Sequence, residues 1–180
     1  MKWMIASDIH GSAHYCELML EAWAREKAHR LILLGDLLYH GPRNDLPREY
    51  APKKVIQMLQ SIAPAPLCVG GNCEAPVDQM VLPFPVLAEY ALLPLDGRLV
   101  FLTHGHIYSP QSPPPLAQGD VLLTGHTHVP AWQDTGEFWY LNPGSVSIPK
   151  EGSAHSYMVL EERTFTWKNL EGGPYHQLSL

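Results

Sequence analysis

Seven side chains of types that commonly bind metal ions occur in five short clusters along the chain. Each cluster directly follows a run of apolar residues, so each lies where a buried strand would end. The clusters are, in chain order, Asp8 with His10, Gly35-Asp36, Gly71-Asn72, His104, and Gly125-His126-Thr127-His128. Any one of them has an ordinary explanation as a turn or as surface polar residues. Together, their carboxylate, imidazole and amide groups form the ligand set of a transition-metal site.

The elements around these clusters predict an α/β fold in which the clusters meet. Residues 2–6, 31–34 and 66–69 are apolar runs suited to strands buried on both faces, with helical patterns between them. One helical stripe begins at Tyr15, and the other follows Pro52, a residue favoured in the first turn of a helix. This β-α-β-α-β order requires a parallel sheet. Because ligands bind at the carboxyl ends of such strands, we expect the polar clusters on one rim.

The second half of the chain has a different pattern, with short strands and no long helical stripe. We expect strands at residues 98–103, 120–124, 131–133, 138–141, 157–161 and 164–168. These strands would form a second sheet packed on the first. No repeat or linker divides the sequence, so residues 1–180 are expected to form a single domain.

Composition limits the class of protein and of partner. The chain has 180 residues, 46% of them hydrophobic, and a net charge of −6, with basic residues scattered among acidic ones. Stable nucleic-acid binding requires clustered Lys and Arg and is not expected. The apolar stretch 81–95 is broken by prolines and by Glu89, so no membrane span is expected. Three cysteines without a paired motif, and no signal peptide, indicate a cytoplasmic protein. The phosphate loop of NTPases and the glycine-rich turn of dehydrogenases are absent.

The five clusters together resemble the signature blocks of the calcineurin-like metallophosphoesterase superfamily over nearly the whole chain. The runs His40-Gly-Pro-Arg-Asn44 and Asn142-Pro-Gly-Ser145 are similar to those of its compact bacterial phosphodiesterases. The resemblance implies a four-layer α-β-β-α sandwich of two mixed sheets, with a dinuclear metal centre between the sheet edges. It also implies hydrolysis of a small phosphodiester, and it leaves open whether the protein is a homo-oligomer.

The resemblance also implies a role for each residue of the clusters. One metal would be held by Asp8, His10, Asp36 and His128, and the other by Asp36, Asn72, His104 and His126. Asp36 would bridge the two, because a carboxylate has two oxygens that can bind two cations. We expect manganese, with iron, zinc, cobalt or nickel as alternatives. Two such ions would lower the pKa of a bridging water to about 7, so that a hydroxide attacks phosphorus.

Three further residues have open roles. Arg43, in the loop after the Asp36 strand, could bind a substrate phosphate or pair with Asp45. Many members of the superfamily have His directly after the Asn of the third cluster, whereas this chain has Cys73. Its thiol would be a weaker acid–base group, or only a packing residue. His106 could act near a leaving group or lie outside the chemistry.

Two other functions are open on this sequence. The same metal centre could serve a phosphomonoesterase or a nucleotide pyrophosphohydrolase, although a short chain without an inserted cap favours a diester in an open site. Some relatives of this fold have lost metal ligands and act as interaction scaffolds. The complete set of candidate ligands in this chain argues against a scaffold role.

Overall fold

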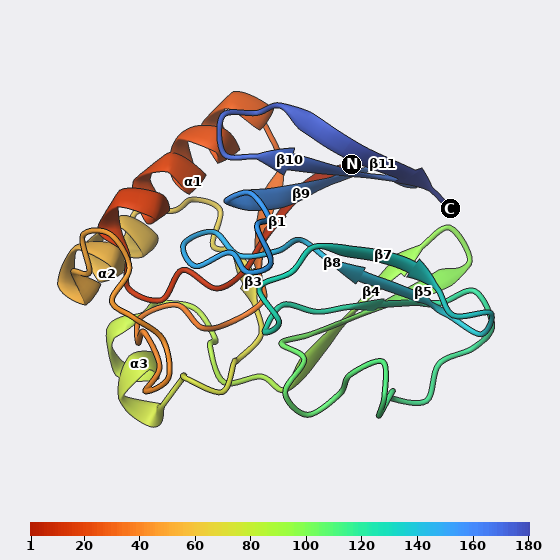
Figure 1. The fold of residues 1–180 in the computed structure, drawn as a ribbon, viewed down its shortest axis with the longest axis horizontal. Coiled ribbons are helices and arrows are strands. Elements are labelled where there is room, and N and C mark those ends of the chain that lie inside the picture. Colours follow the sequence, from red (N-terminus) through yellow and green to blue (C-terminus); the bar gives the residue numbers. More distant parts are fainter.

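Two β-sheets lie face to face in the computed structural model of residues 1–180, with helices beside the first sheet (Figure 1). The helices are α1 (Ala13–Glu26), α2 (Pro52–Gln60) and α3 (Pro76–Val81). The first sheet contains β1 (Lys2–Ala6), β2 (Arg30–Leu33), β3 (Leu67–Cys68), β9 (Ser156–Glu161), β10 (Thr164–Asn169) and β11 (Pro174–Ser179). The second sheet contains β4 (Tyr90–Leu95), β5 (Arg98–Thr103), β6 (Val121–Leu123), β7 (Ala131–Asp134) and β8 (Trp139–Asn142).

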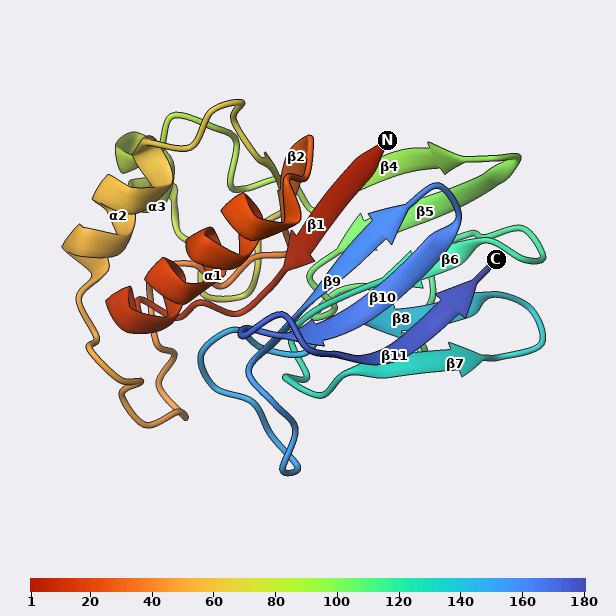
Figure 2. The ribbon, with the colours of Figure 1, turned by 90° about the horizontal axis from the view of Figure 1, so that it is seen from above.

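Both sheets are mixed, as predicted. The first has the strand order β11-β10-β9-β1-β2-β3, in which β1, β2 and β3 are parallel and the other neighbours are antiparallel. The second has the order β4-β5-β6-β8-β7, in which β5, β6 and β8 are parallel. Figure 2 shows the two sheets from above, with the first in front of the second. In each sheet, parallel pairing brings the loops that follow these strands to one edge.

Alternate residues of the central strands belong to two different cores. Met4 and Leu31 pack against the helices, whereas Ile5 and Ile32 face the second sheet. All of these side chains are completely buried. Burial on both faces explains why the strands are apolar throughout, without alternation. Burying one such side chain contributes about 2 kcal/mol, so these strands provide a rigid base for the loops that follow them.

Local signals set the ends of the helices. The hydroxyl of Ser12 accepts a hydrogen bond from the backbone N–H of Tyr15 at 3.2 Å and so caps the start of α1. The same hydroxyl donates to the carbonyl oxygen of Arg48 at 2.6 Å, which attaches the loop between β2 and α2 to this helix. α2 begins at Pro52, as predicted. None of the helices is long and apolar enough to cross a lipid bilayer.

The structure corrects part of the prediction for the second half of the chain. Residues 157–161 and 164–168 are strands, but β9 and β10 belong to the first sheet, where β9 pairs with β1. This pairing places Trp3 opposite Leu160, two residues from opposite ends of the chain. Three elements are not predicted from the sequence: β4, β11 and α3. Local side-chain patterns indicate that a strand forms, but they do not specify its partner.

A loop covers the outer face of the second sheet. Phe101, Leu122 and Tyr140 point away from the first sheet and form a small core with Tyr108 and Leu116. Both of the latter residues belong to the connection between β5 and β6, which runs along the lower side of the sheet in Figure 1. The predicted α/β class and the two facing mixed sheets are confirmed. The layer outside the second sheet is made by this loop instead of a helix.

Candidate metal centre

The five polar clusters meet at the ends of strands from both sheets. Each of the following candidate ligands comes directly or closely after one of five strands: Asp8 and His10 (β1), Asp36 (β2), Asn72 (β3), His104 (β5), and His126 and His128 (β6). The carboxylate of Asp8 accepts the backbone N–H of His126 at 3.1 Å, which connects the two sheets at this point. The structure therefore brings all seven predicted ligands into one region.

One subgroup consists of Asp8, His10 and His128. Nδ1 of His10 lies 2.8 Å from the carbonyl oxygen of Tyr39, and Nδ1 of His128 lies 2.6 Å from that of Ile148. A carbonyl oxygen only accepts, so each Nδ1 carries a proton and donates it, and each Nε2 of a neutral ring presents a lone pair. The two Nε2 atoms are 3.2 Å apart. Oδ1 of Asp8 lies 3.6 Å from Nε2 of His10 and 3.3 Å from Nε2 of His128.

The centre of this subgroup is suited to a cation. Oδ1 of Asp8 is buried and has no hydrogen-bond partner. A buried, unpaired carboxylate oxygen next to two imidazole lone pairs is unfavourable unless a positive charge lies between them. Carboxylate oxygen and imidazole nitrogen are donors that bind Mn, Fe, Co or Zn. These residues therefore fit a divalent metal ion.

A second subgroup converges on His104. Its Nδ1 donates to the carbonyl oxygen of Leu34 at 2.6 Å, so its Nε2 is also free to bind. This Nε2 lies 3.4 Å from Oδ2 of Asp36, 3.1 Å from Oδ1 of Asn72 and 3.2 Å from Nδ1 of His126. The donors are again a carboxylate, an amide oxygen and two imidazoles. Donors of these types suit a divalent metal ion, as in the first subgroup.

Asp36 lies between the two subgroups. Its Oδ2 is 3.6 Å from Nε2 of His10 in one subgroup and 3.4 Å from Nε2 of His104 in the other. Its Oδ1 accepts the backbone N–H of Cys73 at 2.9 Å, which fixes the orientation of the carboxylate. Asp36 therefore occupies the place that a ligand shared by two ions would need.

Glu74, which is not among the residues predicted from the sequence, holds together the two loops that carry Asp36 and Asn72. Its carboxylate accepts the backbone N–H groups of Asp36 at 2.8 Å, of Leu37 at 2.7 Å and of Gly71. Gly71 lies so close to Asp36 that a Cβ at this position would overlap the Asp36 carboxylate. Burial, with the charge of Asp36, raises the pKa of Glu74. The signal in the sequence is an acid directly after Gly71-Asn72-Cys73.

Charge interactions in the cluster shift pKa values in opposite directions. Burial alone would raise the pKa of Asp8 and Asp36, but the neighbouring histidines, when they are protonated, lower both. Burial alone would lower the pKa of His104, but Asp36 and Asp8 raise it to about 9. The pKa of His10 is raised by the same two carboxylates. Both carboxylates are therefore ionised at neutral pH, and any metal ion at His104 would compete with a proton.

The backbone at the candidate ligands is strained. Five of the seven have a left-handed conformation although none is glycine: φ is 60° at Asp8, 49° at His10, 55° at Asp36, 64° at His126 and 62° at His128. Such a conformation costs about 1 kcal/mol at each residue. A left-handed conformation persists only where the surrounding structure holds the backbone in place. Here the contacts of these residues with carbonyl oxygens, carboxylates and glycines hold it.

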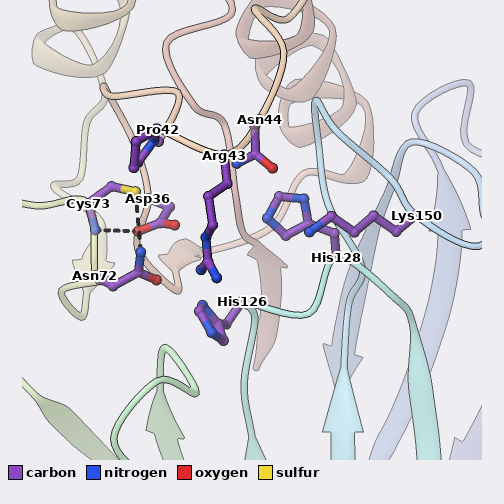
Figure 3. A pocket seen from close by; sticks show the side chains of 10 residues that line it. Asp36, Pro42, Arg43, Asn44, Asn72, Cys73, His126, His128 and Lys150 are labelled. Atoms are coloured by element: carbon purple, nitrogen blue, oxygen red, sulfur yellow. Dashed lines mark hydrogen bonds between the residues drawn. The ribbon is translucent and has the colours of Figure 1, made fainter.

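A pocket of about 320 Å³ connects the cluster with the surface (Figure 3). Its lining comprises Asp36, Gly41, Pro42, Arg43, Asn44, Asn72, Cys73, His126, His128 and Lys150. Arg43 extends into this pocket, and no ion pair joins it to Asp45. Lys150, which the sequence analysis does not identify, extends toward His128. The pocket is thus the route by which a substrate would approach the candidate ligands.

Cys73 and His106 occupy different positions relative to this pocket. Cys73 lines it, and burial together with the charge of Asp36 raises the pKa of its thiol to about 12. The thiol therefore keeps its proton at neutral pH. His106 is exposed, with its ring centre 5.4 Å from that of His104 and 6.2 Å from that of His126. Burial, and then the charge of His104, lower the pKa of His106, so this imidazole is neutral.

Comparison with known proteins identifies the family. Residues 1–164 match the calcineurin-like phosphoesterase superfamily domain. The chain is 50% identical over 161 residues to phosphodiesterase YfcE of Escherichia coli K12, with 89% of this chain and 88% of the relative covered. The solved structure of YfcE, a phosphoesterase from E. coli, matches with a TM-score of 0.95 at 46% identity, over 99% of each chain. Vps29 of Entamoeba histolytica complexed with zinc shares the fold, with a TM-score of 0.60 at 18% identity over 99% of each chain. This chain therefore belongs to the calcineurin-like phosphoesterase superfamily, which confirms the expected resemblance.

Proposed function

We propose that this protein is a metal-dependent phosphodiesterase that hydrolyses a small phosphodiester at a dinuclear centre. The observation that carries the proposal is the buried, unpartnered Oδ1 of Asp8, which faces the lone pairs of His10 and His128. The 50% identity with a relative named as a phosphodiesterase supports the choice of reaction.

The candidate ligands divide between two ions in this proposal. One ion would be held by Asp8, His10, Asp36 and His128, and the other by Asp36, Asn72, His104 and His126. Two divalent ions, for which manganese is our first choice, would polarise the phosphoryl group and lower the pKa of the attacking water toward neutrality. The distances of both subgroups to Asp36 support this division.

The chain itself provides orientation and an open site. The carbonyl oxygens of Tyr39, Ile148 and Leu34 fix the tautomers and ring planes of three histidines. Hydrolysis forms a bond from the water oxygen to phosphorus and breaks the bond to the leaving oxygen. Cys73, the thiol that lines the pocket, is a weaker acid–base group than an imidazole and a poor donor to that oxygen. The leaving alkoxide then takes a proton from solvent, so we expect the enzyme to prefer good leaving groups.

We also propose that the protein acts in the cytoplasm on a small substrate. Cys16, Cys68 and Cys73 are all free thiols, which supports a reducing compartment. The net charge of −6 disfavours a nucleic-acid substrate, whose phosphates would be repelled outside the metal site.

The proposal is tested by hydrolysis of bis(4-nitrophenyl) phosphate and 4-nitrophenyl phosphate by metal-stripped protein, before and after addition of Mn²⁺. We expect cleavage of the diester only after Mn²⁺ is added, with little cleavage of the monoester. Faster cleavage of the monoester would favour a phosphomonoesterase. No cleavage of either ester by folded protein with Mn²⁺, Zn²⁺, Co²⁺ or Ni²⁺ would contradict the enzymatic proposal and favour a scaffold.

A further inference from the structure

We propose that the substrate carries a second anionic group, a phosphate or carboxylate, which Arg43 and Lys150 bind beside the metal ligands. This inference rests on the proposed phosphodiesterase function and adds the chemical class of the part of the substrate that does not react. It follows from the composition of the pocket, from the charges in it and from the way its two loops are fixed.

The pocket is polar and offers no platform for a base or an acyl chain. Its apolar lining is limited to Pro42 and Cys73, and no Phe, Tyr or Trp contributes to it. Nucleobases are bound mainly by stacking on aromatic side chains, and lipid chains are bound by apolar contacts. The group that occupies this pocket is therefore polar or charged.

Two cationic side chains enter the pocket from different loops (Figure 3). Arg43 belongs to the connection between β2 and α2, and Lys150 belongs to the connection between β8 and β9. Both side chains are exposed, and neither forms an ion pair with a carboxylate of this chain. Asp36 is the only acid that lines the pocket, and its oxygens are directed at the Cys73 N–H and toward His10 and His104. The two cations are therefore available to a ligand.

Hydrogen bonds fix the backbone from which both cations project. The side-chain amide of Asn44 donates to the carbonyl oxygen of His40 at 2.9 Å, within the loop that carries Arg43. The backbone N–H of Lys150 donates to the carbonyl oxygen of His128 at 3.1 Å. The hydroxyl of Ser153 donates to the carbonyl oxygen of Lys150 at 2.7 Å. Preorganised loops of this kind reduce the entropy that a ligand loses on binding.

The charge of a simple diester does not account for this arrangement. A phosphodiester has a single negative charge, which two divalent ions would already neutralise. Two additional cations in one pocket repel each other and any metal ion nearby, unless an anion lies between them. A guanidinium forks onto a phosphate or carboxylate, and an ammonium adds a flexible point charge. A second anionic group on the substrate would pair with both Arg43 and Lys150.

The test compares two diesters with the same leaving group, using the protein loaded with Mn²⁺. They are 4-nitrophenyl 3-carboxypropyl phosphate and 4-nitrophenyl 3-carbamoylpropyl phosphate, which differ by one charge and hardly in size. We expect kcat/KM for the carboxylate to exceed that for the amide by roughly tenfold. Arg43→Gln and Lys150→Gln should each reduce this ratio by about threefold. Arg48→Gln, which removes an exposed charge from the same loop outside the pocket, should leave the ratio unchanged.

Each outcome distinguishes this inference from the proposed reaction. Equal cleavage of the two esters by the wild type would overturn the second anionic group and leave the phosphodiesterase function standing. If the ratio of kcat/KM values is the same in both variants as in the wild type, Arg43 and Lys150 do not bind the second anionic group. No cleavage of either ester would overturn the proposed function, and the inference with it.

Discussion

Replacing Glu74 with Gln tests whether its carboxylate holds the ligand loops in place. The carboxylate accepts three backbone N–H groups, from Asp36, Leu37 and Gly71. Gln has nearly the same size, but its NH₂ group would face N–H donors where an oxygen now accepts them. One or two hydrogen bonds to a charged acceptor are lost, at about 1.5 kcal/mol each. We therefore expect the free energy of unfolding to fall by about 2 kcal/mol.

The assay measures both stability and metal binding. Urea unfolding of metal-free protein gives the change in free energy, and a loss of this size corresponds to a fall in Tm of about 6 °C for a chain of this length. Because two ligand loops lose their common attachment, the affinity for Mn²⁺ should fall about tenfold in calorimetric titration. Glu21→Gln, on the exposed side of α1, is the matched control and should change neither quantity.

Two results would refute this reasoning. A variant within about 0.5 kcal/mol of the wild type would behave like an ordinary surface substitution and show that the three hydrogen bonds do not stabilise the fold. A destabilised variant with unchanged affinity for Mn²⁺ would show that Glu74 stabilises the fold without positioning the ligands.

Other perturbations separate the roles of single residues. Asp36→Asn should lower kcat/KM by at least about a hundredfold, because it removes the charge shared by both ions; activity within a few-fold of the wild type would contradict the shared ligand. His126→Ala should release one metal ion per chain more readily than the other, and equal retention of both in elemental analysis would contradict the proposed division. In the metal-free protein, the pKa of His104 is raised to about 9, so its stabilising charge is complete below about pH 6.5 and lost as pH rises through about 9. Because a metal ion must displace that proton, affinity for Mn²⁺ should rise between pH 7 and 9, and a flat titration across this range would argue against His104 as a ligand. Cys73→His should raise turnover on alkyl diesters with poor leaving groups, and an unchanged rate would indicate that position 73 faces away from the leaving group.

The sequence predicted the parts of the site that depend on strand ends. Asp8, Asp36 and His104 follow apolar runs, and because such runs become buried parallel strands, their ends meet. Glu74 and Lys150 escaped prediction for a different reason. Glu74 acts on backbone N–H groups of another loop, and Lys150 enters the pocket from a turn more than a hundred residues after Asp36 in the chain. A short sequence pattern shows an acid directly after Cys73, but it does not identify the N–H groups which that acid binds or the pocket that Lys150 enters.

The fold was predictable in its elements and less so in their pairing. The strand that ends at Glu161 was expected from its apolar residues, but its antiparallel partner is β1, at the other end of the chain. β4 was obscured because Pro94 lies within it and because Tyr90 and Leu92 are half exposed. β4 is an edge strand with one open face, a position that tolerates a proline, whereas Pro94 argues against a strand when the sequence is read alone.

The left-handed residues of the candidate centre indicate how this fold would change if it stopped binding metal. Asp8, His10, Asp36, His126 and His128 together hold about 5 kcal/mol of backbone strain, an amount comparable with the net stability of many domains. Glycine at these positions would relieve the strain but would remove the metal ligand. A descendant freed from catalysis would therefore gain stability by losing its ligands. In the absence of metal ions, such a descendant should be more resistant to heat than the enzyme from which it came.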